Sequence, residues 1–210
     1  MTEFNSITDS LIAMDEKKLT ELVQDALDQG VSAKEILNEG LIPGMDIVGE
    51  KMESGDMFIP EVLNSAKAMS AAVEILKPLL GDEGISTAGK VVVGTVKGDL
   101  HDIGKNLVTM MLESAGFEVY DLGIDVPPEK FIAAVKEKEA DLLGLSALLT
   151  TTMPMMKQTI DAIVESGLRD SVKVIVGGAP VNQGFAEKIG ANGYAPDAGS
   201  AVRLAKALLH

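Results

Sequence analysis

The segment VVVGTVKGDLHDIG, residues 91–104, sets the architecture of the second half of the chain. It begins with a β-branched run, 91–96, which is typical of a buried parallel strand. A glycine-bounded loop follows, in which His101 stands between Asp99 and Asp102. The chain has two histidines, and the other is its last residue. A single internal histidine directly after a buried strand raises the question of whether this loop has a chemical role.

Strand and helix patterns alternate five times after Lys90. Because such alternation is typical of a doubly wound parallel sheet with right-handed crossovers, we predict an α/β domain with five parallel strands. Ligands bind beyond the carboxyl ends of such strands, which here are followed by the loops 98–104, 146–152 and 177–180. The expected strands cover 91–96, 117–123, 141–146, 172–178 and 193–195, and helices are expected near 103–116, after 128, at 154–167, from 181 and up to 209.

Residues 1–80 have helical apolar spacing throughout. Gly30 is expected to end one helix, and the segment from Ser32 to Glu35 matches a capping box that opens the next. Gly40 and Pro43 are expected to interrupt this helix before another begins near Met45. Helices with such short connections predict a four-helix bundle. The glycine-rich stretch 81–89 is interpreted as a linker, which divides the chain into domains at 1–88 and 89–210.

Composition excludes several classes of protein. The chain has 210 residues, 46% of them hydrophobic, and no cysteine, so disulfides, thiolate metal sites and cysteine catalysis are excluded. A net charge of −14 argues against nucleic acid as a partner, because phosphate binding needs a basic surface. The sequence has neither a signal-peptide pattern nor an apolar run long enough to span a membrane. We therefore expect a cytoplasmic location and no membrane partner.

The residues around His101 permit several interpretations on their own. A lone loop histidine is usually solvated or hydrogen-bonded. Asp99 could instead accept a proton from one ring nitrogen and leave the other free as a metal ligand. The chain lacks the phosphate-loop and dinucleotide motifs, and a G-x-S-x-G serine nucleophile. A response-regulator receiver would need an aspartate where the third strand ends in Ser146. If a metal binds, its remaining ligands are expected to come from a cofactor.

Three motifs together resemble those of cobalamin-binding domains. The segment 99–104 resembles the D-x-H-x-x-G signature of that family, 146–148 resembles its S-x-L, and 177–178 its G-G. Residues 41–69 resemble the helical cap of methionine synthase and of corrinoid proteins that serve methanol, methylamine and betaine methyltransferases. The resemblance covers nearly the whole chain. It implies an N-terminal four-helix bundle and a C-terminal flavodoxin-like, or Rossmann-like, five-stranded sheet that binds cobalamin or a related corrinoid.

The resemblance also implies roles for individual residues. His101 would be the lower axial ligand of cobalt, and Asp99 would hydrogen-bond its far nitrogen. Methionine synthases continue this relay to a serine, and Thr152 falls at the matching position. Ser146 and Thr150 would bind the buried nucleotide tail, which would slide past the small glycines 104, 177 and 178. The further cofactor-binding residues implied within this domain are Gly98, Asp102, Ile103, Leu148 and Ala198.

The upper face of the corrin is covered by the cap in this family. Matching the cap motif implies that Met52 and Ile59 lie over the methyl group, while Glu39 reaches the corrin edge. Methionine synthase has a bulky aromatic residue where this chain has Met52. The alternative is that Met52, Met57 and Phe58 are ordinary bundle core, since apolar helix positions usually are.

The implied function is that of a methyl carrier in one-carbon metabolism. Cobalt(I) would accept a methyl group from a donor held by a substrate-specific methyltransferase. The methyl group would then pass from methylcobalt(III) to a second methyltransferase that serves tetrahydrofolate or a thiol. The chain has no room for a (β/α)₈ barrel of about 250 residues, so we expect a carrier subunit that is not itself an enzyme. A reductive activator is a further expected partner, and 81–89 is expected to act as a hinge. Two alternatives are a cobalamin-dependent sensor and a binding module without a corrinoid.

Overall fold

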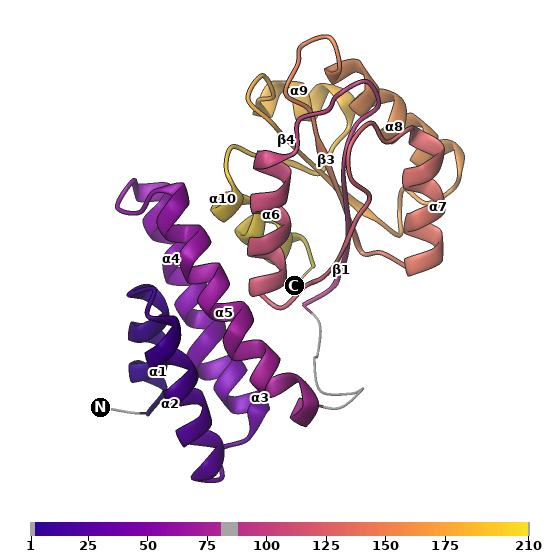
Figure 1. Cartoon of the computed structure of the whole chain (residues 1–210). Coiled ribbons are helices and arrows are strands. Elements are labelled where there is room, and N and C mark those ends of the chain that lie inside the picture. Colours follow the sequence, from indigo (N-terminus) through magenta and orange to yellow (C-terminus); the bar gives the residue numbers. More distant parts are fainter. Residues whose placement is uncertain (1–2, 81–87, 210) are drawn as a thin grey trace. The chain divides into compact units, whose positions relative to one another are not determined.

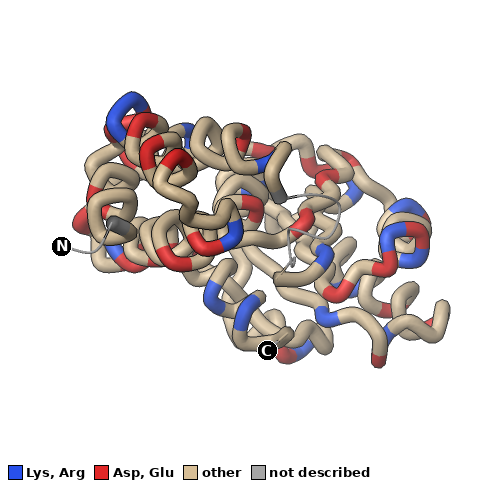
Figure 2. The backbone as a smooth tube through the Cα atoms, turned by 90° about the horizontal axis from the view of Figure 1, so that it is seen from below, with Lys and Arg blue, Asp and Glu red and all other residues tan. Residues whose placement is uncertain are grey.

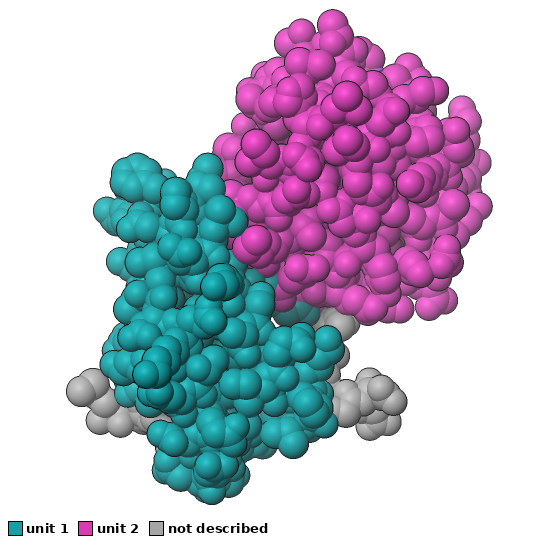
Figure 3. All heavy atoms as spheres, in the orientation of Figure 1, with its two compact units in different colours: residues 1–86, 114–116 teal, residues 87–113, 117–210 magenta. Residues whose placement is uncertain are grey.

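The chain divides into two compact units in the computed structural model, which describes residues 3–80 and 88–209. Residues 1–86 with 114–116 form the first unit, and residues 87–113 with 117–210 form the second (Figure 3). Most of the expected linker and hinge, 81–87, lies outside the described residues. The domain boundary at 88 and 89 therefore stays a prediction.

The first unit is a bundle of four helical segments, as predicted. They are α1 (Glu3–Ile12), α2 (Glu16–Asp28), a run formed by α3 (Ala33–Glu35), η1 (Ile36–Leu41) and α4 (Ile42–Ser54), and α5 (Ile59–Leu80) (Figure 1). The expected capping box is present, because the Ser32 hydroxyl binds the Glu35 N–H and the Glu35 carboxylate binds the Ser32 N–H. The buried core of the bundle includes Ile7, Leu11, Leu19, Val23, Val48, Val62, Met69 and Leu76.

The prediction that Gly40 and Pro43 interrupt the helix is wrong. The residues 36–41 form a π-helix, in which the Ile42 N–H binds the Leu37 carbonyl, and α4 follows without a break. Pro43 then lies in the first turn of α4, directly after the π-helix. The hydroxyl of Thr8 donates to the Gly40 carbonyl at 2.8 Å. A Cβ atom on Gly40 would lie 3.0 Å from Ile7 Cγ2, so this glycine permits the close approach of α1.

The second unit contains the predicted five-stranded parallel sheet, in the order β2-β1-β3-β4-β5. The strands are β1 (Lys90–Thr95), β2 (Glu118–Asp121), β3 (Leu142–Ser146), β4 (Lys173–Gly177) and β5 (Gly193–Ala195). The helices are α6 (Ile103–Ser114), α7 (Pro128–Lys138), α8 (Met153–Glu165), α9 (Gln183–Ile189) and α10 (Ala198–Leu209). Figure 1 shows α6 and α10 on one side of the sheet and α7 and α8 on the other.

Side chains of alternate strand residues pack into the core between the sheet and the helices α7 to α9. Val92, Leu143 and Val174 contribute from the strands, and Phe131 and Met156 contribute from α7 and α8. Gly94 of β1 makes room for Phe131, because a Cβ there would lie 2.6 Å from the ring. The three central strands are thus fixed in register, which fixes where their carboxyl ends lie.

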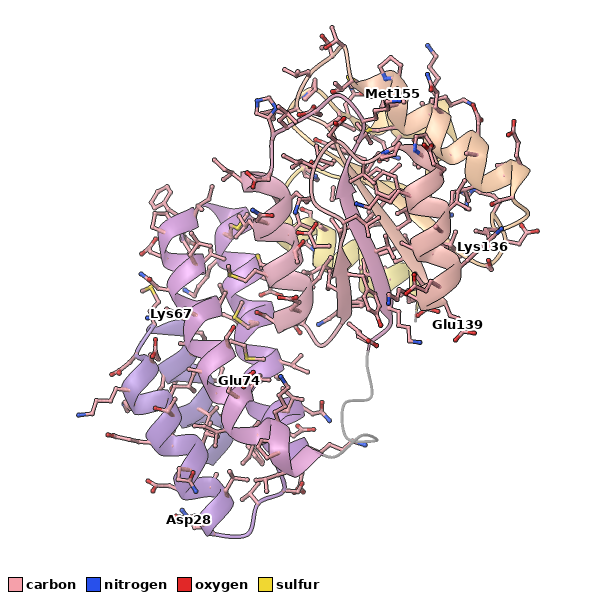
Figure 4. All side chains as sticks on the ribbon, turned by 45° about the vertical axis from the view of Figure 1, so that its right-hand side comes forward. Asp28, Lys67, Glu74, Lys136, Glu139 and Met155 are labelled. Carbon is pink, nitrogen blue, oxygen red and sulfur yellow. The ribbon has the colours of Figure 1, made fainter. Side chains whose placement is uncertain are left out.

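Charged residues are spread over the helices of both units. The chain has 32 acidic and 18 basic residues, and Figure 2 shows the basic positions interspersed with acidic ones. Several ion pairs join neighbouring side chains, such as Lys67 with Glu16 and Lys77 with Glu74. Figure 4 labels Lys67 and Glu74 on α5. These pairs are exposed and contribute little to stability. No helix among residues 3–80 and 88–209 combines the length and apolarity that a membrane span requires.

Candidate functional site

The carboxyl ends of four strands form one row across the sheet. Thr95 of β1 is in register with Ser146 of β3, Ser146 with Gly177 of β4, and Gly177 with Ala195 of β5. The loops that follow β1, β3 and β4 therefore meet at this edge, and β1 and β3 flank the point where the strand order reverses. Open parallel sheets bind their ligands there.

Asp99 lies at the centre of these loops and is fully buried. Its Oδ1 accepts hydrogen bonds from His101 Nδ1 at 2.6 Å and from the His101 backbone N–H at 3.2 Å. A carboxylate only accepts, so Nδ1 carries the proton and the imidazole lone pair is on Nε2. The His101 side chain is 49% exposed. The loop thus presents a free, oriented ring nitrogen at the edge of the sheet.

The second carboxylate oxygen of Asp99 holds the loop after β3. Its Oδ2 accepts from the Leu148 N–H at 2.8 Å, from the Leu149 N–H at 3.2 Å and from the Thr152 hydroxyl at 2.7 Å. Thr152 Oγ1 also lies 2.9 Å from the Leu149 carbonyl, but a hydroxyl has one proton and the carboxylate is the stronger acceptor. Thr152, Asp99 and His101 therefore form one continuous hydrogen-bonded chain.

These hydrogen bonds decide the charge of Asp99. Burial by itself would raise the pKa of this carboxyl, but the bonds from the Thr152 hydroxyl, the His101 ring and the backbone N–H groups of Leu148 and His101 outweigh it. Together they hold the pKa far below its usual range. Asp99 is therefore a buried carboxylate that is ionised at neutral pH next to the imidazole.

The low pKa of Asp99 predicts an acid-dependent stability. We expect Asp99→Asn to lower the free energy of unfolding at neutral pH by about 2 kcal/mol, because charge-assisted hydrogen bonds are lost. Since the folded-state pKa is depressed, this contribution is complete above the unfolded pKa of about 3.9 and is lost as the pH falls below it. Urea unfolding of the cofactor-free protein at several pH values tests this. An equal difference between the two proteins at every pH would contradict it.

The glycines of the site differ in what surrounds them. Gly98 has a φ of +83° and Gly178 a φ of +130°, which glycine adopts readily and other residues do not. A Cβ on Gly178 would lie 1.9 Å from the Ala147 carbonyl oxygen, and one on Gly177 would lie 3.1 Å from the Ala195 oxygen. A Cβ on Gly104 would meet nothing within 4 Å. The fold itself thus requires Gly178, whereas nothing in the fold requires Gly104.

The other predicted residues of this unit surround the histidine at the same edge. Asp102 accepts from the Asn106 side chain and backbone at the start of α6, and Ile103 is 81% exposed. Within the described residues, the hydroxyls of Ser146 and Thr150 have no hydrogen-bond partner. Leu148 is partly exposed, and Ala198 is buried at the start of α10. Sequence reasoning missed two exposed apolar neighbours, Leu100 and Leu149, although both flank motif residues.

Glu39, Met52 and Ile59 belong to the helical unit and are described within it. Glu39 is exposed on the π-helix, Met52 is half-buried on α4, and Ile59 is 50% exposed at the start of α5. The alternative that the cap methionines and Phe58 are bundle core is right for Met57, which is buried, and wrong for Phe58, which is 70% exposed. Phe58 is thus an exposed apolar side chain in the connection between α4 and α5.

The single nitrogen ligand that His101 offers fits a metal whose other ligands come from a cofactor. Among residues 3–80 and 88–209, no group of three histidine, aspartate or glutamate side chains converges to hold a metal ion. One imidazole nitrogen, backed by Asp99, is what the protein offers. A corrinoid brings most of the ligands of its own cobalt, and His101 would supply a further nitrogen ligand. The free hydroxyls and the open space at Gly104 suit an attached nucleotide tail.

Comparison with known proteins identifies the class to which this fold and site belong. The family described as B12 binding domain matches residues 89–203, and a second B12 binding domain family matches residues 3–77. The chain therefore belongs to the B12-binding domain family of corrinoid proteins, and its cofactor is cobalamin or a related corrinoid. The family match covers the parts of the chain that contain His101 and the four-helix bundle.

Individual relatives match over nearly the full length. A corrinoid protein of Desulfitobacterium hafniense (strain Y51) is 43% identical over 100% of this chain and 98% of its own length. The dimethylamine corrinoid protein of Methanosarcina barkeri is 47% identical over 97% of this chain and 95% of its own length. A chain of the methanol:cobalamin methyltransferase complex MtaBC from the same organism superposes with a TM-score of 0.87. It is 34% identical, and the match covers 99% of this chain and 79% of that chain.

Proposed function

We propose that this protein carries a methyl group between two methyltransferases on the cobalt of its corrinoid. The observation that carries the proposal is the pairing of His101 with Asp99. One ring nitrogen is held at 2.6 Å by a buried carboxylate, and the other is free at the carboxyl edge of the sheet. When bound, the corrinoid supplies a metal centre that accepts and releases a methyl group.

The residues around His101 adjust how strongly it binds the metal. Nε2 would bind the metal, and the ionised Asp99 keeps the proton on Nδ1 and fixes the orientation of the ring. The Thr152 hydroxyl donates to Asp99 and so moderates its charge. The orientation of His101 and the position of Asp99 are thereby linked through one hydrogen bond.

Other residues hold the remainder of the cofactor. Ser146 and Thr150 offer free hydroxyls to the nucleotide tail, and the open space at Gly104 leaves room for it. Met52 and Ile59 of the helical unit shield the reactive face with apolar groups, and Glu39 contacts the ring edge. Exposed apolar side chains such as Ile103 and Leu148 contact the corrin and exclude water from it.

The methyl donor that we propose is a methylamine. The full-length relative that is 47% identical is named a dimethylamine corrinoid protein, whereas the chain from the methanol complex is 34% identical. The protein acts as a non-catalytic subunit in the cytoplasm. A substrate-specific methyltransferase delivers the methyl group, and a second methyltransferase transfers it to tetrahydrofolate or a thiol. A reductive activator returns the metal to its reduced state.

Reconstitution and methyl transfer test this proposal in sequence. Cob(II)alamin is first added to the cofactor-free protein, and the visible and EPR spectra are expected to show a protein nitrogen on cobalt. The reduced holoprotein is then combined with a dimethylamine methyltransferase or a methanol methyltransferase, each with its own substrate. Faster methylation from dimethylamine supports the assignment. Faster methylation from methanol would overturn the donor, and no methylation from any donor would overturn the carrier role.

A further inference from the structure

The segment after β2 runs beside β1 and reaches the loop that carries His101. Beyond the last residue of β2, the Leu122 N–H binds the Val93 carbonyl at 2.8 Å and the Gly123 carbonyl accepts from Thr95 at 2.9 Å. The Val126 N–H then binds the Thr95 carbonyl at 3.0 Å. Residues 122–126 therefore extend the pairing with β1 past the edge of the sheet and into the site.

Asp125 makes two contacts with the turn that precedes His101. Its Oδ1 accepts from the Gly98 N–H at 2.6 Å, and its own N–H donates to the Asp99 carbonyl at 3.0 Å. Its φ is +52°, a left-handed conformation that is uncommon for residues other than glycine but that aspartate and asparagine tolerate. The backbone of Asp125 is thus held in an uncommon conformation, with its own N–H and the Val126 N–H both hydrogen-bonded. Such a conformation indicates a specific structural role for this residue.

The backbone of the turn itself is closed by one hydrogen bond, while the Asp99 side chain is held by the loop after β3. The Asp99 N–H binds the Val96 carbonyl at 3.1 Å, and Gly98 has the positive φ that such a turn requires at its third position. Lys97 and Gly98 are exposed. Asp125 binds one peptide N–H of this turn and one carbonyl, and so fixes the backbone from which the Asp99 side chain projects.

We propose that Asp125 is a positioning residue for His101 and acts through Asp99. The His101 ring is half exposed, and its hydrogen-bond partner is Asp99. The direction of Nε2 therefore depends on where Asp99 is held. This inference rests on the proposed function for its importance, since a fixed Nε2 matters only if that nitrogen binds the metal.

Three substitutions separate the hydrogen bond from the backbone conformation. Asp125→Asn keeps an acceptor oxygen and tolerates positive φ, so it should behave as the natural protein. Asp125→Gly removes the acceptor and adopts positive φ freely, and Asp125→Ala removes the acceptor and disfavours that φ. If Asp125→Ala does not fold, the comparison of the Gly and Asn variants still decides the question.

Asp141 provides a matched control at the other edge of the sheet. Its carboxylate accepts from the Lys90 N–H at 2.8 Å, and its own N–H donates to the Lys90 carbonyl at 2.9 Å. The same two kinds of contact are thus made far from the site. Figure 4 labels Glu139, two residues before Asp141, at the amino-terminal edge of the sheet. It also labels Met155 on α8, beside the carboxyl edge that carries the site. Asp141→Ala should lower the melting temperature as much as Asp125→Gly does.

Two measurements are made on the cofactor-free protein and one with cofactor. Hydrogen exchange gives the exchange rate of the Gly98 N–H. The ¹⁵N chemical shifts of the histidine rings give the fraction of neutral His101 with its proton on Nδ1. The signals of the two histidines are assigned with His101→Asn. The third measurement is the affinity for cob(II)alamin, with the cobalt–nitrogen coupling seen by EPR.

In Asp125→Gly we expect faster hydrogen exchange of the Gly98 N–H and a smaller fraction of His101 with its proton on Nδ1. We also expect about five-fold weaker binding of cob(II)alamin, which is the equivalent of one hydrogen bond. Asp125→Asn and Asp141→Ala should match the natural protein in all three. An unchanged His101 tautomer in Asp125→Gly, or an equal effect from Asp141→Ala, would overturn it. If the natural protein binds cobalamin without nitrogen coupling, the proposed function fails, while the two cofactor-free measurements still decide the role of Asp125.

Discussion

Replacing Gly178 with alanine is expected to destabilise the cofactor-free protein by on the order of 4 kcal/mol, a large part of the stability of an ordinary domain. The new Cβ would lie 1.9 Å from the Ala147 oxygen and 2.8 Å from the Ala147 carbonyl carbon, and both atoms are backbone. The φ of +130° adds backbone strain for any residue with a side chain. Urea unfolding followed by circular dichroism measures the loss. Stability within about 1 kcal/mol of the natural protein would show that the loop after β4 can move aside.

Gly104 is the matched control for that experiment and also tests the cofactor groove. A Cβ there would meet no atom of the surrounding protein within 4 Å, and the position lies in the first turn of α6, where leucine is a good helix former. Gly104→Leu should therefore fold as well as the natural protein or better. If the nucleotide tail lies in this space, its affinity for cob(II)alamin should fall at least about ten-fold, which corresponds to one displaced contact. Natural affinity in this variant would remove Gly104 from the site.

The contrast between these glycines marks how far sequence reasoning reaches. The motif identified Gly104, Gly177 and Gly178 alike, and the resemblance attributed their small size to the cofactor. The structure gives Gly178 a reason within the fold, because the Ala147 peptide group lies against its Cα. Ala147 follows a different strand, so this contact depends on the packing of two loops, and no local pattern encodes it.

Local patterns did predict the elements that position the site. The β-branched runs and helical spacings predicted five parallel strands with their intervening helices, because period and propensity act over a few residues. The contact between Asp99 and His101 could also be expected, since the two are close along the chain. The prediction of a break at Gly40 and Pro43 was wrong, because the π-helix keeps that run continuous and Gly40 serves the packing of α1.

Contacts across a crossover were predicted only where the resemblance supplied them, as for Thr152. Asp125 lies 27 residues from Gly98, and sequence reasoning considered the loops after β1, β3 and β4 but not the loop after β2. Lys105 is similar: it is buried on α6 and pairs with Asp121 at the end of β2, a contact that depends on how α6 packs on the sheet. A useful signal would have been the rule that all loops at the carboxyl edge border one ligand site.

The largest functional effect is expected from His101→Gly. Cob(II)alamin bound to this variant should lose the nitrogen coupling in its EPR spectrum, and its affinity should fall on the order of 100-fold, as expected when a metal site loses a protein ligand. The cofactor-free protein should remain folded, because the His101 side chain is 49% exposed and its removal leaves Asp99 bound by the loop after β3. Lys97→Ala, an exposed change in the same loop, should leave the spectrum and the affinity unchanged.

Added imidazole makes the same experiment decisive. The glycine variant leaves space next to Asp99 Oδ1, and a free imidazole can donate its N–H to that oxygen and direct its other nitrogen at the metal. Nitrogen coupling should therefore return as imidazole is titrated in, and it should return less well in His101→Gly combined with Asp99→Ala. In ¹⁵N-labelled His101→Gly, a ¹⁵N coupling that persists without imidazole would mean that another group of the chain binds the metal, whereas a ¹⁴N coupling would come from the cofactor's own base. In the first case Asp99 would hold a loop histidine with no part in ligation, and the carrier mechanism proposed for this site would have to be abandoned.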